Sequence, residues 1–164
     1  MDNNTIIPEI STLDTELCSG LGQFQTDKNK QKPKESQVPF ELKLPSISMA
    51  KIQSMADDPQ EIDKAMAQWF IPSPLSTRVK AEQLKDGEYY ALWADIDDQP
   101  PTLEALAELV ESEFLCDFEV YTSRSAKEDY QKARIIIPLA TLVDGHTFEL
   151  LQECLNDRLE QNNI

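Results

Sequence analysis

The chain has 164 residues and a formal net charge of −15, from 30 acidic and 15 basic side chains. This length allows one domain with a hydrophobic core, or a smaller domain with a tail. The acidic excess argues against non-specific nucleic-acid binding, which depends on neutralising phosphates with basic side chains, so any contact with DNA should be local. An acidic surface usually serves solubility, and more rarely it imitates the charge of nucleic acid.

The cysteines, Cys18, Cys116 and Cys154, are widely spaced and form no Cys-x-x-Cys motif, so the sequence supports neither a disulfide framework nor a zinc site. The N-terminus lacks a basic region followed by an apolar segment, and no run approaches the roughly 18 apolar residues that a membrane span needs. We therefore expect a reduced, soluble, cytoplasmic protein without a membrane partner.

Residues 1–37 are polar, poor in aromatic side chains, and end in a lysine-containing segment at 28–34. Such a segment cannot bury enough apolar surface to offset its ordering entropy, which predicts a disordered tail. Its lysines serve either as a solvated linker or as a contact with a phosphate backbone. The domain is then expected to cover residues 38–164.

The first part of this domain contains an expected strand followed by two expected helices. Residues 38–44 alternate apolar and polar side chains, which predicts a short edge strand. Residues 46–55 and 62–70 carry apolar side chains at helical spacing, so Trp69 and Phe70 are expected in the core on a helix.

Residues 89–98 combine an apolar run with terminal carboxylates, which predicts a buried strand with an acidic end. Because side chains alternate along a strand, Asp95 and Asp97 should point to one face about 7 Å apart, while Ile96 points to the other. Two carboxylates on one face suit a hard divalent cation such as Mg²⁺, and Asp98 lies next to them. The alternative is a solvated acidic loop after the strand.

The remaining sequence predicts a helix, two strands and a final helix. Thr102 follows two prolines and is placed to cap a helix with an apolar stripe. Strands are expected at residues 118–122 and 134–139, with a polar connection at 123–132, and an amphipathic helix at 147–159. We expect one shared core that includes Trp93, Leu106, Val120, Ile136 and Leu155.

The order β-α-β-β-α predicts an α+β fold: a split β-α-β unit, of ferredoxin-like or RNA-recognition-motif (RRM) type, without its last strand. A helical segment and the disordered tail precede this unit. Three explanations for the missing strand remain open: residues 38–44 fill the place, the edge is open to a partner, or the chain is a fragment of something longer.

Three stretches, at residues 93–97, 121–126 and 132–139, together look like the first part of the archaeo-eukaryotic primase-polymerase (prim-pol) domain of plasmids, phages and integrated elements. The similarity covers about residues 65–164. The resemblance implies metal-dependent nucleotidyl transfer, with Asp95 and Asp97 as catalytic ligands of Mg²⁺ or Mn²⁺. It also implies nucleotide-phosphate contacts from four residues: Ser123, Arg124, Ser125 and Arg134.

The chain departs from this family pattern in two ways. The second motif of the family often contains a histidine, whereas here Arg124 occupies that stretch and His146 sits where a helix should begin. The family's third acidic motif and final strand would begin beyond Ile164, since Asp144 and Asp157 fall in a turn and a helix. The residues alone also allow a plainer interpretation, in which Arg124 and Arg134 pair with nearby acids such as those at positions 128 and 129.

Two classes of function follow. The first is a primase-polymerase-like domain of a mobile-element replication protein, truncated and weakly active or inactive alone, with nucleoside triphosphates and DNA as partners. The second is a non-catalytic acidic binding protein, which imitates nucleic acid or inhibits a replication helicase or another DNA-handling protein.

Overall fold

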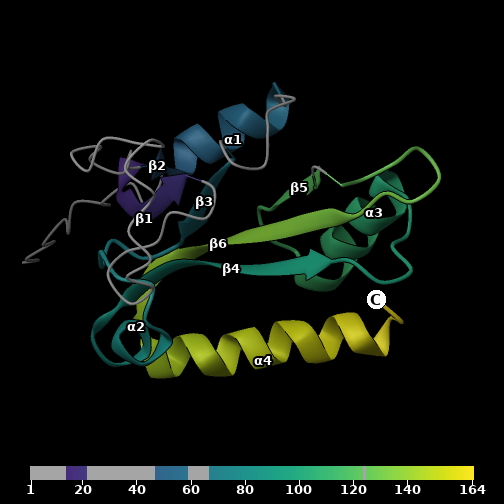
Figure 1. The fold of residues 1–164 in the computed structure, drawn as a ribbon. Coiled ribbons are helices and arrows are strands. Elements are labelled where there is room, and N and C mark those ends of the chain that lie inside the picture. Colours follow the sequence, from purple (N-terminus) through teal and green to yellow (C-terminus); the bar gives the residue numbers. More distant parts are fainter. Residues whose placement is uncertain (1–13, 22–46, 59–66, 124) are drawn as a thin grey trace, which may run out of the picture.

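The computed structural model describes residues 14–21, 47–58, 67–123 and 125–164 (Figure 1). Six strands and four helices lie within this part of the chain. In chain order they are β1 (Glu16–Leu21), β2 (Ile47–Ser48), α1 (Met49–Asp57), β3 (Gln68–Ile71), α2 (Lys80–Asp86), β4 (Glu88–Ile96), α3 (Leu103–Phe114), β5 (Glu119–Thr122), β6 (Ala133–Asp144) and α4 (Gly145–Gln161). The expected α+β class is confirmed.

The larger sheet has the strand order β4-β6-β5, and β6 is antiparallel to both of its neighbours. Strands β4 and β5 are therefore parallel to each other, with α3 connecting them and β6 between them. This is the strand order that a split β-α-β unit has. Among the described residues no strand pairs with the outer edge of β4, so β4 is an edge strand and β6 is the central one.

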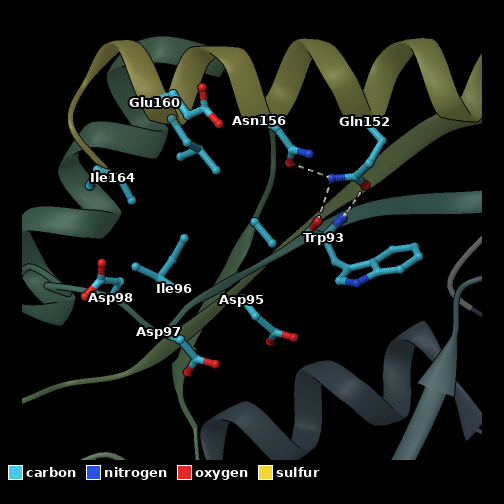
Figure 2. A pocket seen from close by; sticks show the side chains of 11 residues that line it. Trp93, Asp95, Ile96, Asp97, Asp98, Gln152, Asn156, Glu160 and Ile164 are labelled. Atoms are coloured by element: carbon cyan, nitrogen blue, oxygen red, sulfur yellow. Dashed lines mark hydrogen bonds between the residues drawn. The ribbon is translucent and has the colours of Figure 1, made fainter.

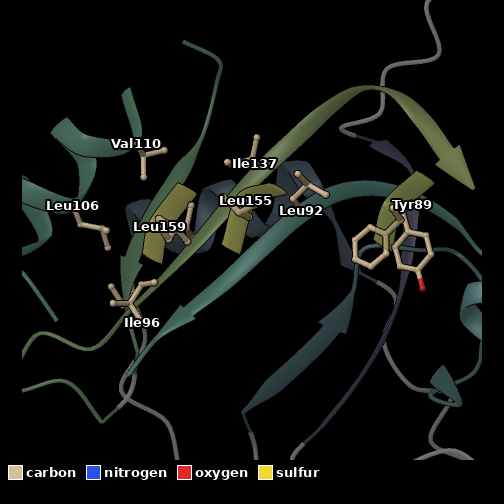
Figure 3. Packing of buried hydrophobic residues seen from close by; sticks show 11 residues of the cluster. Tyr89, Leu92, Ile96, Leu106, Val110, Ile137, Leu155 and Leu159 are labelled. Atoms are coloured by element: carbon tan, nitrogen blue, oxygen red, sulfur yellow. The ribbon is translucent and has the colours of Figure 1, made fainter. Parts of the chain in front are cut away.

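Helices α3 and α4 cover one face of this sheet, and α4 runs along β4 (Figure 1). Alternate residues of β4 and β6, such as Leu92 and Ile135, meet the apolar stripes of the two helices. Leu106 and Leu155 are buried in this cluster, as expected, and Trp93 and Val120 pack against it (Figure 3).

The opposite face of the sheet has a second core, which the single-core expectation missed. Ile136 is completely buried there, beside Leu17 of β1 and Met49 of α1, and not beside Leu106. Ile136 and Ile135 are adjacent in a strand, so their side chains must enter different cores. A small sheet of order β2-β1-β3 and helix α1 supply the covering layer (Figure 1).

The N-terminal expectations need two corrections. Residues 16–21, expected within a disordered tail, form β1, and Trp69 and Phe70, expected on a helix, lie in β3. The two strands are antiparallel partners, with Gly20 opposite Trp69. The apolar residues before and at Trp69 and Phe70 have helical spacing, but pairing of this segment with β1 makes it a strand. The expected strand at 38–44 and the lysine-containing segment at 28–34 lie outside the described residues.

Helix starts follow the capping signals in the sequence. The Thr102 hydroxyl accepts a hydrogen bond from the Ala105 N–H and begins α3, as expected. The Asp144 carboxylate accepts from the Thr147 N–H and begins α4, so His146 lies in the first turn of that helix. No helix in the described ranges is both long and apolar enough to cross a membrane.

Candidate functional site

The acidic end of β4 has the geometry that strand alternation predicts. Asp95 and Asp97 point to the same side, whereas Ile96 points toward α4 and is 6% exposed (Figure 2). The carboxylates thus lie on the face of the sheet that α1 covers farther along, and both are solvent-accessible. Asp95 lies within β4, whereas Asp97 and Asp98 follow its last residue, Ile96, in an exposed segment. The alternative of a solvated acidic loop after the strand therefore stays open for Asp97 and Asp98.

Each of the two carboxylates has a basic partner, one on the central strand β6 and one immediately before it. Asp95 and Arg134 are direct cross-strand neighbours, and Arg134 Nε donates to Asp95 Oδ1 over 2.6 Å. Lys132 Nζ lies 3.3 Å from Asp97 Oδ1. The sequence placed Arg134 near the aspartates correctly, whereas its pairing with the acids at 128 or 129 is wrong.

Arg134 is held as a cation by its surroundings. Burial lowers its pKa, but the hydrogen bond to Asp95 and the interaction with Tyr121 outweigh burial, so the pKa of Arg134 is raised overall. Burial also raises the pKa of the Tyr121 hydroxyl, against the effect of Arg134. Tyr121 is the cross-strand neighbour of Arg134 on β5, so acid, base and phenol form one row across the sheet.

A second row of neighbouring residues lies two positions farther along, just beyond the strand ends. The Ser123 N–H donates to the Lys132 carbonyl, and Lys132 Nζ lies near Asp97, so these three residues are neighbours just beyond the ends of β5, β6 and β4. The hydroxyls of Ser123 and Ser125 are 3.2 Å apart. Arg124, the remaining residue assigned to phosphate contact, lies outside the described residues.

Hydrogen bonds join the connection between β5 and β6 to the end of β4. The Tyr130 hydroxyl donates to the Asp97 carbonyl over 2.8 Å and accepts from the Gln99 N–H. The Gln131 side chain accepts from the Leu103 N–H at the start of α3. These bonds hold the serines and Lys132 near the aspartates, although the connection contains no long strand or helix.

A metal site is only partly assembled in this part of the chain. Asp95 and Asp97 could each offer a carboxylate oxygen, but no group of three acidic, histidine or cysteine side chains suited to a metal occurs among the described residues. Asp98 points away from the other two carboxylates (Figure 2). Asp98 therefore does not complete a group of three carboxylates with Asp95 and Asp97.

A pocket of about 430 Å³ lies on the other side of the same strand end (Figure 2). Its walls are the outer edge of β4, from Trp93 to Asp98, and the facing side of α4. Gln152, Asn156 and Glu160 are the polar α4 residues that line it. The strand end therefore has two distinct surfaces: a charged face over β4, β6 and β5, and a pocket along the β4 edge.

Sequence reasoning missed Lys132 and Tyr130. Lys132 was detectable, since it lies two positions before Arg134 and must share its face on an extended strand. Tyr130 carried no such signal, because its contact with Asp97 depends on how the connection folds back.

No protein-family model, curated protein or solved structure matches this chain. The chemistry must therefore be judged from the charged face itself. Carboxylates at the end of β4, cations at the start of β6 and hydroxyls after β5 form a surface that offers oxygen ligands on one side and phosphate-binding groups on the other.

Proposed function

We propose that the charged face binds the divalent-metal complex of a nucleoside triphosphate, as part of a primase-polymerase-like domain of a mobile-element replication protein acting in the cytoplasm. The observation that carries this proposal is the placement of Arg134 and Lys132 directly beside Asp95 and Asp97. A metal triphosphate needs both kinds of group, since its cation takes carboxylate oxygens and its phosphates take cationic donors.

Each residue has a defined role in the proposed complex. Asp95 and Asp97 would hold Mg²⁺ or Mn²⁺, which would supply neutralisation of phosphate charge during nucleotidyl transfer. The guanidinium of Arg134 and the ammonium of Lys132 would turn from their aspartates to phosphate oxygens as the metal takes the carboxylates. Ser123 and Ser125 would donate hydroxyl hydrogen bonds from the neighbouring strand end, with Arg124 between them in sequence.

We expect nucleotide binding without efficient synthesis. In-line transfer requires the triphosphate, the metals and the attacking hydroxyl to be positioned together. Asp95 and Asp97 gain no third acidic partner among the described residues. The 164-residue chain should therefore bind nucleotide weakly and should not extend a DNA primer.

Calorimetry with Mn²⁺, and with dATP in the presence and absence of Mn²⁺, tests the proposal. The full chain should bind dATP only when Mn²⁺ is present, and Asp95→Asn with Asp97→Asn should abolish this binding. A metal complex at a hundredfold excess over Kd should stabilise the fold by about 2.7 kcal/mol. Arg134→Gln should weaken dATP binding more than it weakens binding of Mn²⁺ alone.

The matched control is Glu153→Gln with Asp157→Asn, which removes two carboxylates from exposed positions on α4. Its Mn²⁺·dATP affinity should equal that of the unmodified chain. Absence of binding at millimolar Mn²⁺·dATP, or equal loss in the control, rejects the proposed site. Template-dependent incorporation that disappears in the Asn variant would instead show a more complete enzyme than we expect.

The ion pairs also favour a second candidate, a non-catalytic acidic binding protein. Arg134 and Lys132 already neutralise the charges of both aspartates, so no metal is required to offset repulsion between the two carboxylates. The net charge of −15 then remains available for a basic surface on a DNA-handling protein such as a replication helicase. Salt-sensitive capture of a purified helicase, unchanged by the Asn variant, would support this candidate over nucleotide binding.

A further inference from the structure

The outer edge of β4 shows an unusual contact with α4. The side-chain amide of Gln152 accepts from the Trp93 N–H over 3.3 Å and donates to the Trp93 carbonyl over 2.7 Å (Figure 2). A neighbouring β-strand would offer the same pair of groups to Trp93 through its backbone. The side-chain amide of Gln152 thus makes the two hydrogen bonds to Trp93 that the backbone of an adjacent strand would make.

The edge continues past this contact into the pocket. Backbone groups alternate between the two sides of a strand, so Asp95, two residues after Trp93, directs its N–H and carbonyl to the same outer edge. The floor beside them is apolar, with Ile96, Leu159 and Ile164 among the lining residues. An extended segment could therefore pair with β4 while placing alternate side chains against this floor.

The charge of the residues that line the pocket indicates which kind of peptide segment could bind there. The lining contains four carboxylate side chains, at positions 95, 97, 98 and 160, and contains neither lysine nor arginine. The first two are paired with Arg134 and Lys132, whereas Asp98 and Glu160 form no ion pair within the described part of the chain. A second copy of this acidic chain would bring carboxylates against carboxylates, which disfavours edge-to-edge pairing of two such chains.

We propose that the pocket between β4 and α4 binds an extended, lysine- or arginine-containing peptide segment of a partner protein, which adds to the sheet as a strand beside β4. The peptide backbone pairs with the β4 edge near Asp95, and its basic side chains lie near Asp98 and Glu160. Asp95 and Asp97 also line this pocket, but the proposed nucleotide site uses their carboxylates together with Arg134 and Lys132, which do not line it.

The probe is a synthetic hexapeptide of alternating lysine and valine, compared with analogues in which threonine or glutamate replaces lysine. Titration of the full chain, followed by amide NMR shifts, should give binding in the order lysine, threonine, glutamate. The shifts should centre on residues 93–98 and the facing side of α4. An N-methylated lysine peptide should not bind, because it keeps the charge and loses the backbone donors.

Three variants and one control variant separate strand addition from general attraction to an acidic protein. Glu160→Gln should weaken the lysine peptide by about two- to fivefold, the range of one exposed ion pair, whereas Glu153→Gln on the exposed side of α4 should not. Asn156→Lys should weaken it further. Gln152→Ala should strengthen binding, because the peptide no longer competes for Trp93, and a merely structural role for Gln152 would leave affinity unchanged.

The proposal is overturned if the N-methylated peptide binds equally well, if the shifts lie elsewhere, or if millimolar lysine peptide does not bind. Sedimentation of the free chain gives a further check. A dimer that the lysine peptide dissociates would identify a second copy as the occupant and would likewise overturn the assignment to a basic partner. None of these measurements changes Asp95 or Asp97, so failure here leaves the nucleotide proposal standing.

Discussion

Arg134 donates to the carboxylate of Asp95 over 2.6 Å, and the two residues face each other across β6 and β4. This contact changes the electrostatics expected for an Asp-x-Asp strand end. Without a cation nearby, two carboxylates would repel and a metal would relieve the repulsion. Because Arg134 and Lys132 pair with them, we expect the aspartates, Asp95 above all, to contribute to stability before any metal binds.

Asp95→Asn should therefore destabilise the metal-free protein, rather than stabilise it by removing repulsion. A hydrogen bond to a charged group contributes about 1.5–3 kcal/mol, but both side chains here are more than a third exposed or close to it, so solvent screening reduces the expected loss to about 1 kcal/mol. Urea unfolding without divalent ions measures the change. In a double-mutant cycle with Arg134→Gln the two losses should not add, and fully additive losses would contradict the coupling.

The local features of this site were predictable from the sequence. The apolar run before Asp95 identified β4, alternation separated Asp95 and Asp97 from Ile96, and Thr102 marked the start of α3. Each of these signals concerns residues a few positions apart, where backbone geometry fixes the relation between side chains.

Relations between distant segments were not predictable in the same way. Pairing of β1 with β3 joins Gly20 to Trp69, and no local pattern at either position indicates the other. A Cβ at position 20 would lie 2.4 Å from Trp69 Cζ2, so the glycine is needed for this close approach. The second core was missed for the same reason: Ile136 is buried against β1 and α1, and the expected β-α-β-β-α order contained no layer on that face of the sheet.

Ile136→Ala tests that second core. Ile136 is completely buried between the larger sheet and the covering layer, so truncation should cost about 2–5 kcal/mol through lost burial and a residual cavity. Leu142→Ala, on the same strand but 44% exposed, should cost about 0.5 kcal/mol or less. Equal small losses for both variants in chemical unfolding would show that the covering layer contributes little.

Asp144 predicts a response to acid. Hydrogen bonds from Thr147 and the nearby His146 hold the pKa of Asp144 below its ordinary value in the folded protein. Because the folded pKa is the lower one, the charged cap stabilises α4 above about pH 4 and this contribution disappears as the pH falls through the folded pKa. Asp144→Asn keeps a capping oxygen without a charge, so stability should depend less steeply on pH below about 4. Asp157→Asn, elsewhere on α4, should leave the Asp144 contribution in place.

Tyr121 predicts the opposite response in alkali. Burial raises the pKa of its hydroxyl, and the negative charge of Asp95 adds to this, while Arg134 acts against both. An unfolded tyrosine ionises near pH 10, so above that pH the unfolded chain releases a proton that the folded chain retains. Stability should therefore fall as the pH rises above about 10, and Tyr121→Phe should reduce the slope of that fall. Part of the slope should survive, because burial also raises the pKa of Tyr89. Urea unfolding at several pH values between 9 and 11 measures both slopes, and an identical slope in the Phe variant would show that Tyr121 ionises freely in the folded protein.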